Sequence, residues 1–509
     1  MLERAPHFRF RIAAPFSLRP EGRRFLLESD TLDAELAKRV GSVEVSLPRL
    51  GAKAPTTASV RFDRVSRWTI RGVVERVELL SQLAALAADQ DAGSDAWVAR
   101  VEEVVGEGAL VENLRAIAAE ASPSGSPTKP RTEAGAAIDA FLRMSGATSG
   151  PTVPAPAKRA RAREALEAAV DEAAQHALSA PALVALEASY RGARWLLEAR
   201  RDAPIQIELV DTARLDDLFA PSHPAEVDDF EAPDLFFASD ACGVESLATA
   251  CARASEAKTP LVAHGPSGPA VADLQASLTG EKAKAWNELR ASDDAHFLCA
   301  VRNEVALCVE GTGASARTVF GSPVWGIAVL LLSSYRESSS FTRVLGQNGQ
   351  QKAPASHLPP GSGADEWALP TREHASLRLQ AEAANVGVTL LGSARRGDAI
   401  LLAEFPTASS SRDARSLPTQ TWVGRIVRFA RWALASLPHA TPDAEVDALL
   451  GQLAKVVLFP GMDAGTRLRA RVVPGEKGAG DVRVDASAEP PVVGVPIEIA
   501  FTLPWRPAA

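Results

Sequence analysis

The sequence predicts a mixed α/β (α+β) fold, in which a small α/β unit is followed by a larger α/β unit that ends in antiparallel strands. Three observations lead to this prediction. Apolar and polar residues alternate near both ends of the chain, helical spacing of apolar residues is common between them, and a stretch rich in Pro, Ser, Gly and Ala interrupts the pattern. A chain of 509 residues is also too long for one hydrophobic core.

These observations divide the chain into three parts. We expect a domain at residues 1–120, a flexible linker at 121–163 and a second domain at 164–509. A further division of the second domain, near residues 315–365, is left open.

The first domain opens with three strand patterns, in which apolar residues occupy every second position. They cover residues 8–12, 43–47 and 60–62. A helix is expected next, because Val73, Val77, Leu80 and Leu83 recur at spacings of three and four and form one buried stripe. Two more helices are predicted, at residues 95–105 and 110–117.

The expected linker holds six prolines among small and polar residues, and it ends in the basic residues Lys158, Arg159, Arg161 and Arg163. Such a stretch buries too little apolar surface to offset its chain entropy. One short helical pattern, residues 134–144, places Ile138, Phe141 and Leu142 on one face. Two interpretations stay open: the helix binds a groove on a partner, or it packs back on its own protein.

The second domain begins with helices and then alternates strands with helices. Ser179 and Pro181 mark a helix start, and the apolar stripe of that helix runs to Leu197. The alternation predicts a largely covered sheet. Strands are expected at residues 205–210, 234–238, 260–263, 297–301 and 305–309, and helices at 243–256 and 281–289.

The remainder of the second domain is predicted to contain helices, a loop and a final group of strands. The helices are expected at residues 324–336, 421–437 and 444–453, with a loop at 346–363. Strands are expected at 388–391 and 399–404, and the chain then ends in strands at 467–473, 482–485 and 495–503.

The composition favours an ordinary globular protein of the cytoplasm. Hydrophobic residues make up 46% and charged residues 23%, with a formal net charge of −8 that gives no reason to expect nucleic acid. No apolar run reaches the roughly 20 residues that span a bilayer, and the N-terminus has no apolar signal core. The four cysteines show no CxxC pairing and are expected to be buried, reduced thiols.

No motif of an active site stands out, so we expect neither an enzyme nor a bound cofactor or metal. A GxxxxGK[ST] phosphate loop is absent from the sequence, and the turn after Val262 lacks the GxSxG spacing of a nucleophile elbow. The histidines are scattered, and the acidic pairs such as Asp293 and Asp294 are interpreted as solvated helix ends. A hydrolase would instead require a polar cleft with converging titratable groups.

Several segments resemble, in order, those of a known pair of proteins. Leu186 to Gly192 (LEASYRG) is the most specific of them. The others are Phe8 to Phe16, Ser42 to Pro48, Val60 to Leu83, Ala285 to Asp294, Pro323 to Gly326, Leu369 to Glu373 and Val473 to Gly480. Together they resemble the small (TssB-like) and large (TssC-like) subunits of the type VI secretion contractile sheath, fused in one chain.

This resemblance implies a fold similar to phage tail sheaths and a structural role. Such subunits stack around an inner tube and contract to drive it outward, so the implied partners are other sheath subunits, the tube protein, baseplate components and an AAA+ recycling unfoldase. By the same resemblance, Ile138, Phe141 and Leu142 would bind the unfoldase. The terminal strands would exchange between neighbouring subunits, through Val482, Val484, Val495, Ile497, Ile499 and Phe501.

A second hypothesis is a sheath-derived adaptor, cap or regulator that does not polymerise. Only a few residues precede Phe8, where the family's small subunit has an additional segment, and Pro496 removes one backbone donor from the last strand.

Overall fold

A computed structural model describes most of the chain and divides it into two compact units. The first, here called the core unit, comprises residues up to Glu35 and from Ala185 onward, and the second, the bundle unit, comprises Leu36–Val184. The described residues are 8–120, 156–221, 232–265, 280–311, 316–338, 340–341, 343–359, 367–394, 396–411, 416–438, 440–458, 467–474, 480–488 and 497–506. Helices and several sheets occur together, so the predicted mixed α/β class is confirmed.

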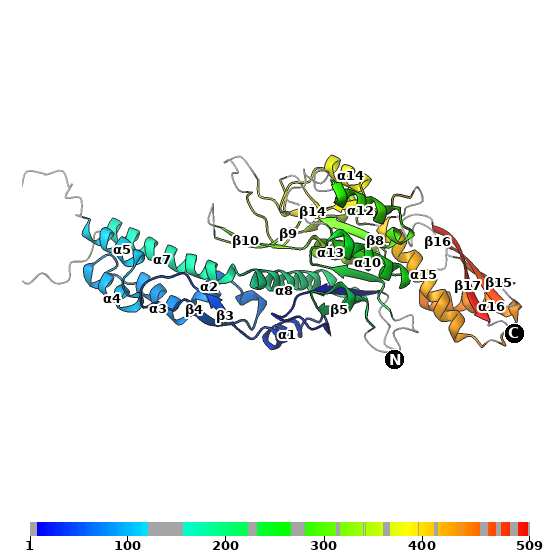
Figure 1. The fold of residues 1–509 in the computed structure, drawn as a ribbon, viewed down its shortest axis with the longest axis horizontal. Helices are drawn as coiled ribbons and strands as arrows, with labels where there is room; N and C mark the ends of the chain where they lie inside the picture. The colour runs from blue at the N-terminus through cyan, green and yellow to red at the C-terminus, as the bar shows by residue number, and fades with distance from the viewer. Residues whose placement is uncertain are drawn as a thin grey trace, which may run out of the picture. The chain divides into compact units, whose positions relative to one another are not determined.

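The core unit is built on a seven-stranded sheet with the order β12-β8-β7-β6-β1-β5-β2; Figure 1 labels two of its strands, β5 and β8. All neighbouring strands are parallel except β2, which runs antiparallel to β5. The strands are β1 (Phe8–Ala14), β2 (Arg23–Leu26), β5 (Ile205–Asp211), β6 (Leu235–Ala238), β7 (Leu261–His264), β8 (Leu298–Arg302) and β12 (Val388–Leu390).

The position of β1 is the main topological result. Phe10 of β1 is paired with Ile207 of β5 on one side and with Leu235 of β6 on the other. A strand from the start of the chain therefore lies in the middle of a sheet that is otherwise formed by strands after residue 200, apart from β2 at its edge.

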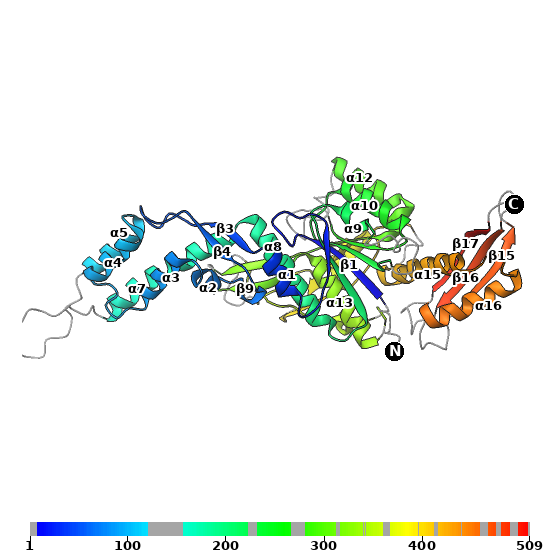
Figure 2. The ribbon, with the colours of Figure 1, turned by 90° about the horizontal axis from the view of Figure 1, so that it is seen from below.

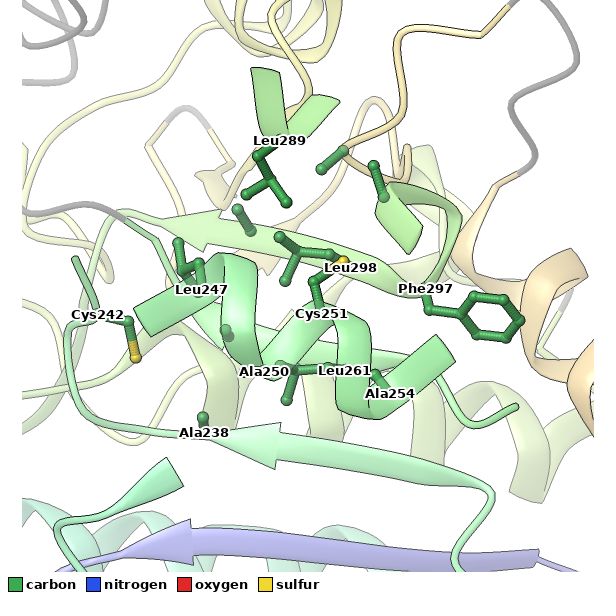
Figure 3. Close-up of a cluster of buried hydrophobic side chains, with 14 of the residues drawn as sticks. Ala238, Cys242, Leu247, Ala250, Cys251, Ala254, Leu261, Leu289, Phe297 and Leu298 are labelled. Atoms are coloured by element: carbon green, nitrogen blue, oxygen red, sulfur yellow. The ribbon is translucent and has the colours of Figure 1, made fainter. Parts of the chain in front are cut away.

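One face of this sheet is covered by α10, α12 and α14. Leu247, Cys251 and Ala254 of α10 belong to one buried cluster with the strand residues Leu261 and Leu298 (Figure 3). The cluster explains why these helices show helical apolar spacing while the strands beneath are apolar throughout. The helices are α10 (Val244–Glu256), α12 (Gly280–Ala291) and α14 (Leu377–Asn385).

On the other face, α13 and its neighbours bury aromatic side chains. Phe8 lies edge-on to Tyr335 and to Phe341, with ring centroids 5.2 and 5.0 Å apart. Tyr190 donates a 2.9 Å hydrogen bond to the carbonyl oxygen of Phe16. The helices here are α8 (Pro181–Arg200) and α13 (Pro323–Ser338). The apolar stripe predicted for α8, which includes Tyr190, is buried except at its last residue: Leu197 is half-buried, and the preceding Leu196 is buried.

Smaller elements complete the core unit. They are α9 (Leu215–Phe219), the ladder β9 (Val305–Glu310) with β10 (Arg317–Gly321), the sheet of β11 (Gln351–Lys352), β13 (Gly392–Ser393) and β14 (Ala399–Leu401), the helices α15 (Leu417–Ser436) and α16 (Asp443–Leu453), and a C-terminal sheet.

The bundle unit combines a β-hairpin with helices. The hairpin pairs β3 (Ser42–Ser46) with β4 (Thr57–Arg61), and the helices are α2 (Ile70–Val74), α3 (Glu78–Ala87), α4 (Asp95–Val105), α5 (Ala109–Ala119) and α7 (Pro156–Leu178); α1 (Leu32–Arg39) spans the boundary between the units. The apolar stripe predicted at Val73, Val77, Leu80 and Leu83 is buried. It is carried by two helices and not by one, because Val77 has an extended backbone (φ −90°, ψ 110°) that separates α2 from α3.

The end of the expected linker is helical. α7 begins at Pro156, which fits a first helical turn. Its basic residues bind the ends of other helices: Lys158 donates to the carbonyl of Ala118 in α5, and Arg163 donates to Ala87 at the end of α3, at 2.7 Å. Residues 156–163, which the sequence analysis placed in the expected linker, are therefore helical and part of the bundle unit.

Helices α5 and α7, which flank residues 121–155, both lie in the unit Leu36–Val184. Residues 134–144, with Ile138, Phe141 and Leu142, fall outside the described residues. The boundaries predicted at residues 120 and 163 stay a prediction, and the residues of the first predicted domain are distributed over both units.

Candidate assembly interface

The C-terminal sheet contains most of the residues predicted to join neighbouring subunits. It has three antiparallel strands in the order β15-β16-β17 (Figure 2). Ala470 stands opposite Val484, and Val484 stands opposite Phe501. The strands are β15 (Arg467–Pro474), β16 (Gly480–Ala488) and β17 (Ile497–Arg506).

The predicted interface residues divide into two groups. Val482 and Val484 are fully buried and lie on the central strand, whose backbone pairs on both sides. They are core residues of the intact sheet and offer no open edge. Ile497, Ile499 and Phe501 lie on β17, where Ile497 is buried while Ile499 and Phe501 are half-buried. Val495 falls outside the described residues.

The outer edge of β15 is covered by helix α16. The backbone N–H of Ala470 donates a 2.8 Å hydrogen bond to Asp447 of α16, so this N–H faces away from β16. The second carboxylate oxygen of Asp447 accepts a 3.0 Å hydrogen bond from Arg469. A backbone donor that a new strand would need is therefore already occupied.

Helix α16 follows β15 over more than one residue. A β-carbon built on Gly451 would stand 4.0 Å from the carbonyl oxygen of Leu468, so that carbonyl also faces the helix. From Asp447 to Gly451 the helix rises about 6 Å, and from Ala470 to Leu468 the strand spans about 6.6 Å. The matched spacing lets one helix lie antiparallel to the strand and cover two successive outward positions.

At the opposite edge, no further strand is paired with β17 within the described part of the chain, although helix α15 also packs against this strand. In an antiparallel ladder, residues alternate between those that bond the partner strand and those that point away from it. The backbone N–H of Ala470 points away from β16, so the backbone groups of Val484, opposite it, point toward β17 and bond those of Phe501. The backbone groups of the next residues along β17, Ala500 and Thr502, therefore point away from β16. Pro504 stands in the same row, where its missing N–H removes no bond within the sheet.

The side chains on β17 show which face of the sheet is covered. Glu498, Ala500 and Thr502 are exposed, while Ile499 and Phe501, on the covered face, are only half-buried. An added strand would extend the sheet and cover these two apolar side chains further. The sequence shows the alternation of β17, but only the register distinguishes this edge strand from the central β16.

The core unit contains a cavity whose position is typical of ligand-binding sites. It measures about 430 Å³ and lies at the carboxyl ends of β1, β5 and β6, where parallel sheets commonly bind ligands. Burial raises the pKa of the Cys242 thiol to about 11, so it is protonated at neutral pH and a poor nucleophile. Among the described residues, no three His, Cys, Asp or Glu side chains are grouped as metal ligands.

The four cysteines are free thiols, as predicted. Cys242, Cys251 and Cys299 are buried, whereas Cys308 is half-buried. Burial raises the pKa of Cys251 and of Cys299 to about 12. Of the helices in the described ranges, none has the length and apolar character to cross a membrane.

Comparison with known proteins gives structural similarities only. No family model matches the chain, and no curated protein matches it. A structure of the anti-feeding prophage (AFP) baseplate, 6-fold symmetrised, matches at 13% identity and a TM-score of 0.36, over 63% of this chain and 77% of that chain.

Two contracted-state structures match in the same way. The PVC sheath complex of an extracellular contractile injection system matches at 11% identity and a TM-score of 0.36, over 63% of this chain and 77% of that chain. The helical sheath of the anti-feeding prophage matches at 12% identity and a TM-score of 0.32, over 62% and 79%. At these identities and TM-scores the similarities assign no family and no function.

Proposed function

We propose that this chain is a structural subunit of a contractile sheath of the type VI secretion kind, with the small and large subunits fused, and that it assembles through the β17 edge. The observation that carries the proposal is the central place of β1. This strand comes from the segment that resembles the small subunit, while β5 and β6 on either side follow the segment that resembles the large one.

The position of β1 makes the two regions interdependent. Without β1, the sheet would have two exposed edges at β5 and β6, each with unpaired backbone groups. Fusion in one chain supplies this strand once per subunit, which suits a repeating structure that needs equal numbers of both regions.

A buried ionic cluster fixes β1 in this position. Asp234, which precedes β6, accepts a 2.8 Å hydrogen bond from the backbone N–H of Arg9 and a 2.7 Å bond from Arg425 of α15. Arg428, one turn along α15, also donates to Asp234, and burial lowers the pKa of Arg428 to about 10. One carboxylate thus joins the start of β1, the start of β6 and the helix that leads toward α16.

In this proposal the β17 edge receives a strand from a neighbouring subunit, and stacked subunits surround an inner tube and contract. The partners are other copies or other sheath subunits, the tube protein, baseplate components and an AAA+ unfoldase that binds Ile138, Phe141 and Leu142, all in the cytoplasm. No catalytic step is part of this function.

A second candidate, the non-polymerising adaptor or cap, is favoured by the closed β15 edge. If β17 is the one edge that can accept a strand, two copies pair through it, with β17 of one copy beside β17 of the other. Such β17–β17 pairing is isologous and closes as a dimer.

Negative-stain electron microscopy of the purified protein, alone and with the matching tube protein, distinguishes the two candidates. Tubes or stacked rings support the sheath subunit. Discrete particles under all conditions, with the mass of a dimer by light scattering, support the adaptor.

A further inference from the structure

We propose that a second cavity of the core unit, lined by residues of β1, α10 and α15, binds a phosphoryl group, either as free phosphate or as part of a nucleotide. The cavity measures about 500 Å³, within the usual range for small-molecule sites. Its charged lining residues among those described are four arginines and one glutamate: Arg11 of β1, Arg253 and Glu256 of α10, and Arg428 and Arg431 of α15. The site is independent of the β17 edge and of assembly.

Two of these arginines are buried and held in place by the fold. Arg11 is 2% exposed and Arg428 is 8% exposed. Arg11 pairs with Glu208 and donates a 2.9 Å hydrogen bond to the carbonyl oxygen of Ala220, while Arg428 donates a 2.8 Å bond to the carbonyl oxygen of Pro233. Guanidinium groups that are already fixed lose little further side-chain freedom when an anion binds beside them.

Positive charge is in excess around this cavity within the described part of the chain. Asp234 pairs with both Arg425 and Arg428, so one carboxylate serves two buried guanidinium groups. The excess extends to Lys258, because burial lowers the pKa of its ammonium group and the charge of Arg431 lowers that pKa further. A bound anion is the ligand that offsets such an excess.

The other two arginines are accessible to a ligand. Arg253 makes only a long ion pair of 3.6 Å with Glu256, and both side chains are exposed. Arg431 is exposed and has no hydrogen bond or ion pair within the described ranges. A guanidinium group donates two parallel N–H bonds that match two oxygens of a phosphoryl group. Trp432 lines the same cavity, and aromatic side chains stack on nucleotide bases.

Isothermal titration calorimetry of the full chain at low salt tests the site with three probes: inorganic phosphate, ADP and adenosine. We expect phosphate and ADP to bind, and adenosine, which lacks a phosphoryl group, to give no heat of binding. Tighter binding of ADP than of phosphate identifies a nucleotide as the ligand. Equal or weaker binding of ADP identifies the free anion.

Two variants place the binding in this cavity. Arg431→Glu should weaken the binding of phosphate and ADP about tenfold or more, because one charge-assisted contact is replaced by a repelling charge. Arg253→Glu should have the same effect. The matched control is Arg378→Glu on α14, where the side chain is 89% exposed. It changes the net charge by the same amount and should leave both affinities unchanged.

Four results would overturn the inference. They are no binding of either phosphate or ADP, equal binding of adenosine and ADP, unchanged affinity in both Arg431→Glu and Arg253→Glu, and an equal loss of affinity in Arg378→Glu. The last result would show that the net charge of the chain, and not this cavity, attracts the anion. Thermal unfolding of each variant without ligand verifies that the fold is intact.

Discussion

Gly192 of α8 lies directly beneath Trp325 of α13, so closely that a β-carbon at residue 192 would stand 2.5 Å from the indole ring. Both residues belong to segments whose sequence resembles the sheath large subunit, and the contact gives the glycine of LEASYRG a physical reason: no other residue allows these two helices to approach so closely.

The first prediction is that Gly192→Ala destabilises the core unit by about 1–3 kcal/mol, because the methyl group forces the buried Trp325 to move. Urea unfolding followed by tryptophan fluorescence measures the loss. Gly243→Ala is the matched control, since a β-carbon there meets nothing within 4 Å. Equal midpoints for both variants would contradict the close approach.

The second prediction concerns the buried cluster around Asp234. Asp234→Ala leaves Arg425 and Arg428, 6% and 8% exposed, without their shared carboxylate, and should cost about 3–5 kcal/mol. Glu198→Gln, at an exposed pair with Arg194, should change the midpoint little. Hydrogen exchange should also show faster opening of β1, and an unchanged β1 would rule out the anchoring role.

The third prediction is that Thr502→Pro abolishes self-assembly and leaves the fold intact. Its N–H points to the open side of β17, so proline blocks an incoming strand and removes no bond to β16. Light scattering and electron microscopy measure assembly.

Two variants control this experiment. Thr502→Ala keeps the N–H and should assemble. Phe501→Pro removes a bond within the sheet and should unfold it. Normal assembly by Thr502→Pro would show that β17 is not the interface.

The fourth prediction is that Cys251 and Cys299 resist alkylation in the native protein. Their pKa values of about 12 leave almost no thiolate at pH 8, and reactivity rises only as the pH approaches those values. Mass spectrometry after iodoacetamide treatment should find the half-buried Cys308 modified first and all four cysteines modified in urea. Early modification of Cys299 would contradict its burial.

The fifth prediction rests on the proposed unfoldase partner: replacing Phe141 and Leu142 with Ser should abolish unfoldase binding, because two of the three apolar side chains proposed to bind it are lost. Pull-down with the purified unfoldase measures this, and Asp139→Asn in the same segment is the control. Unchanged binding by the double variant would exclude this segment as the recognition site.

Local patterns in the sequence predicted most elements well. The helix at residues 95–105 matches α4 (Asp95–Val105) because Ser94 caps it and Gly106 ends it with a positive φ, both visible in the sequence. The strands near residues 205, 261 and 298 were also found, since β-branched and apolar runs between turns are typical of covered strands.

Long-range relationships could not be predicted in this way. The placement of β1 between β5 and β6 depends on pairing across about two hundred residues. The basic residues before Glu164 were visible only as charges, because their partners, the carbonyls of Ala87 and Ala118, belong to other helices. The open edge at β17 became apparent only from the hydrogen bond between Ala470 and Asp447, which no sequence pattern shows.

Because α5 and α7 belong to the same bundle, a pulling force on the chain ends between them would act on both helices at once. A force that pulls on Glu120 and Pro156 acts at the end of α5 and the start of α7, two helices of the same unit. There the pair of Arg161 with Glu120 and the bond from Lys158 to Ala118 carry the load first. The force therefore peels α7 away from α5 starting at one end, breaking contacts one after another and not all at once. Opening of the bundle that starts at Glu120 and Pro156 would therefore need little force per step.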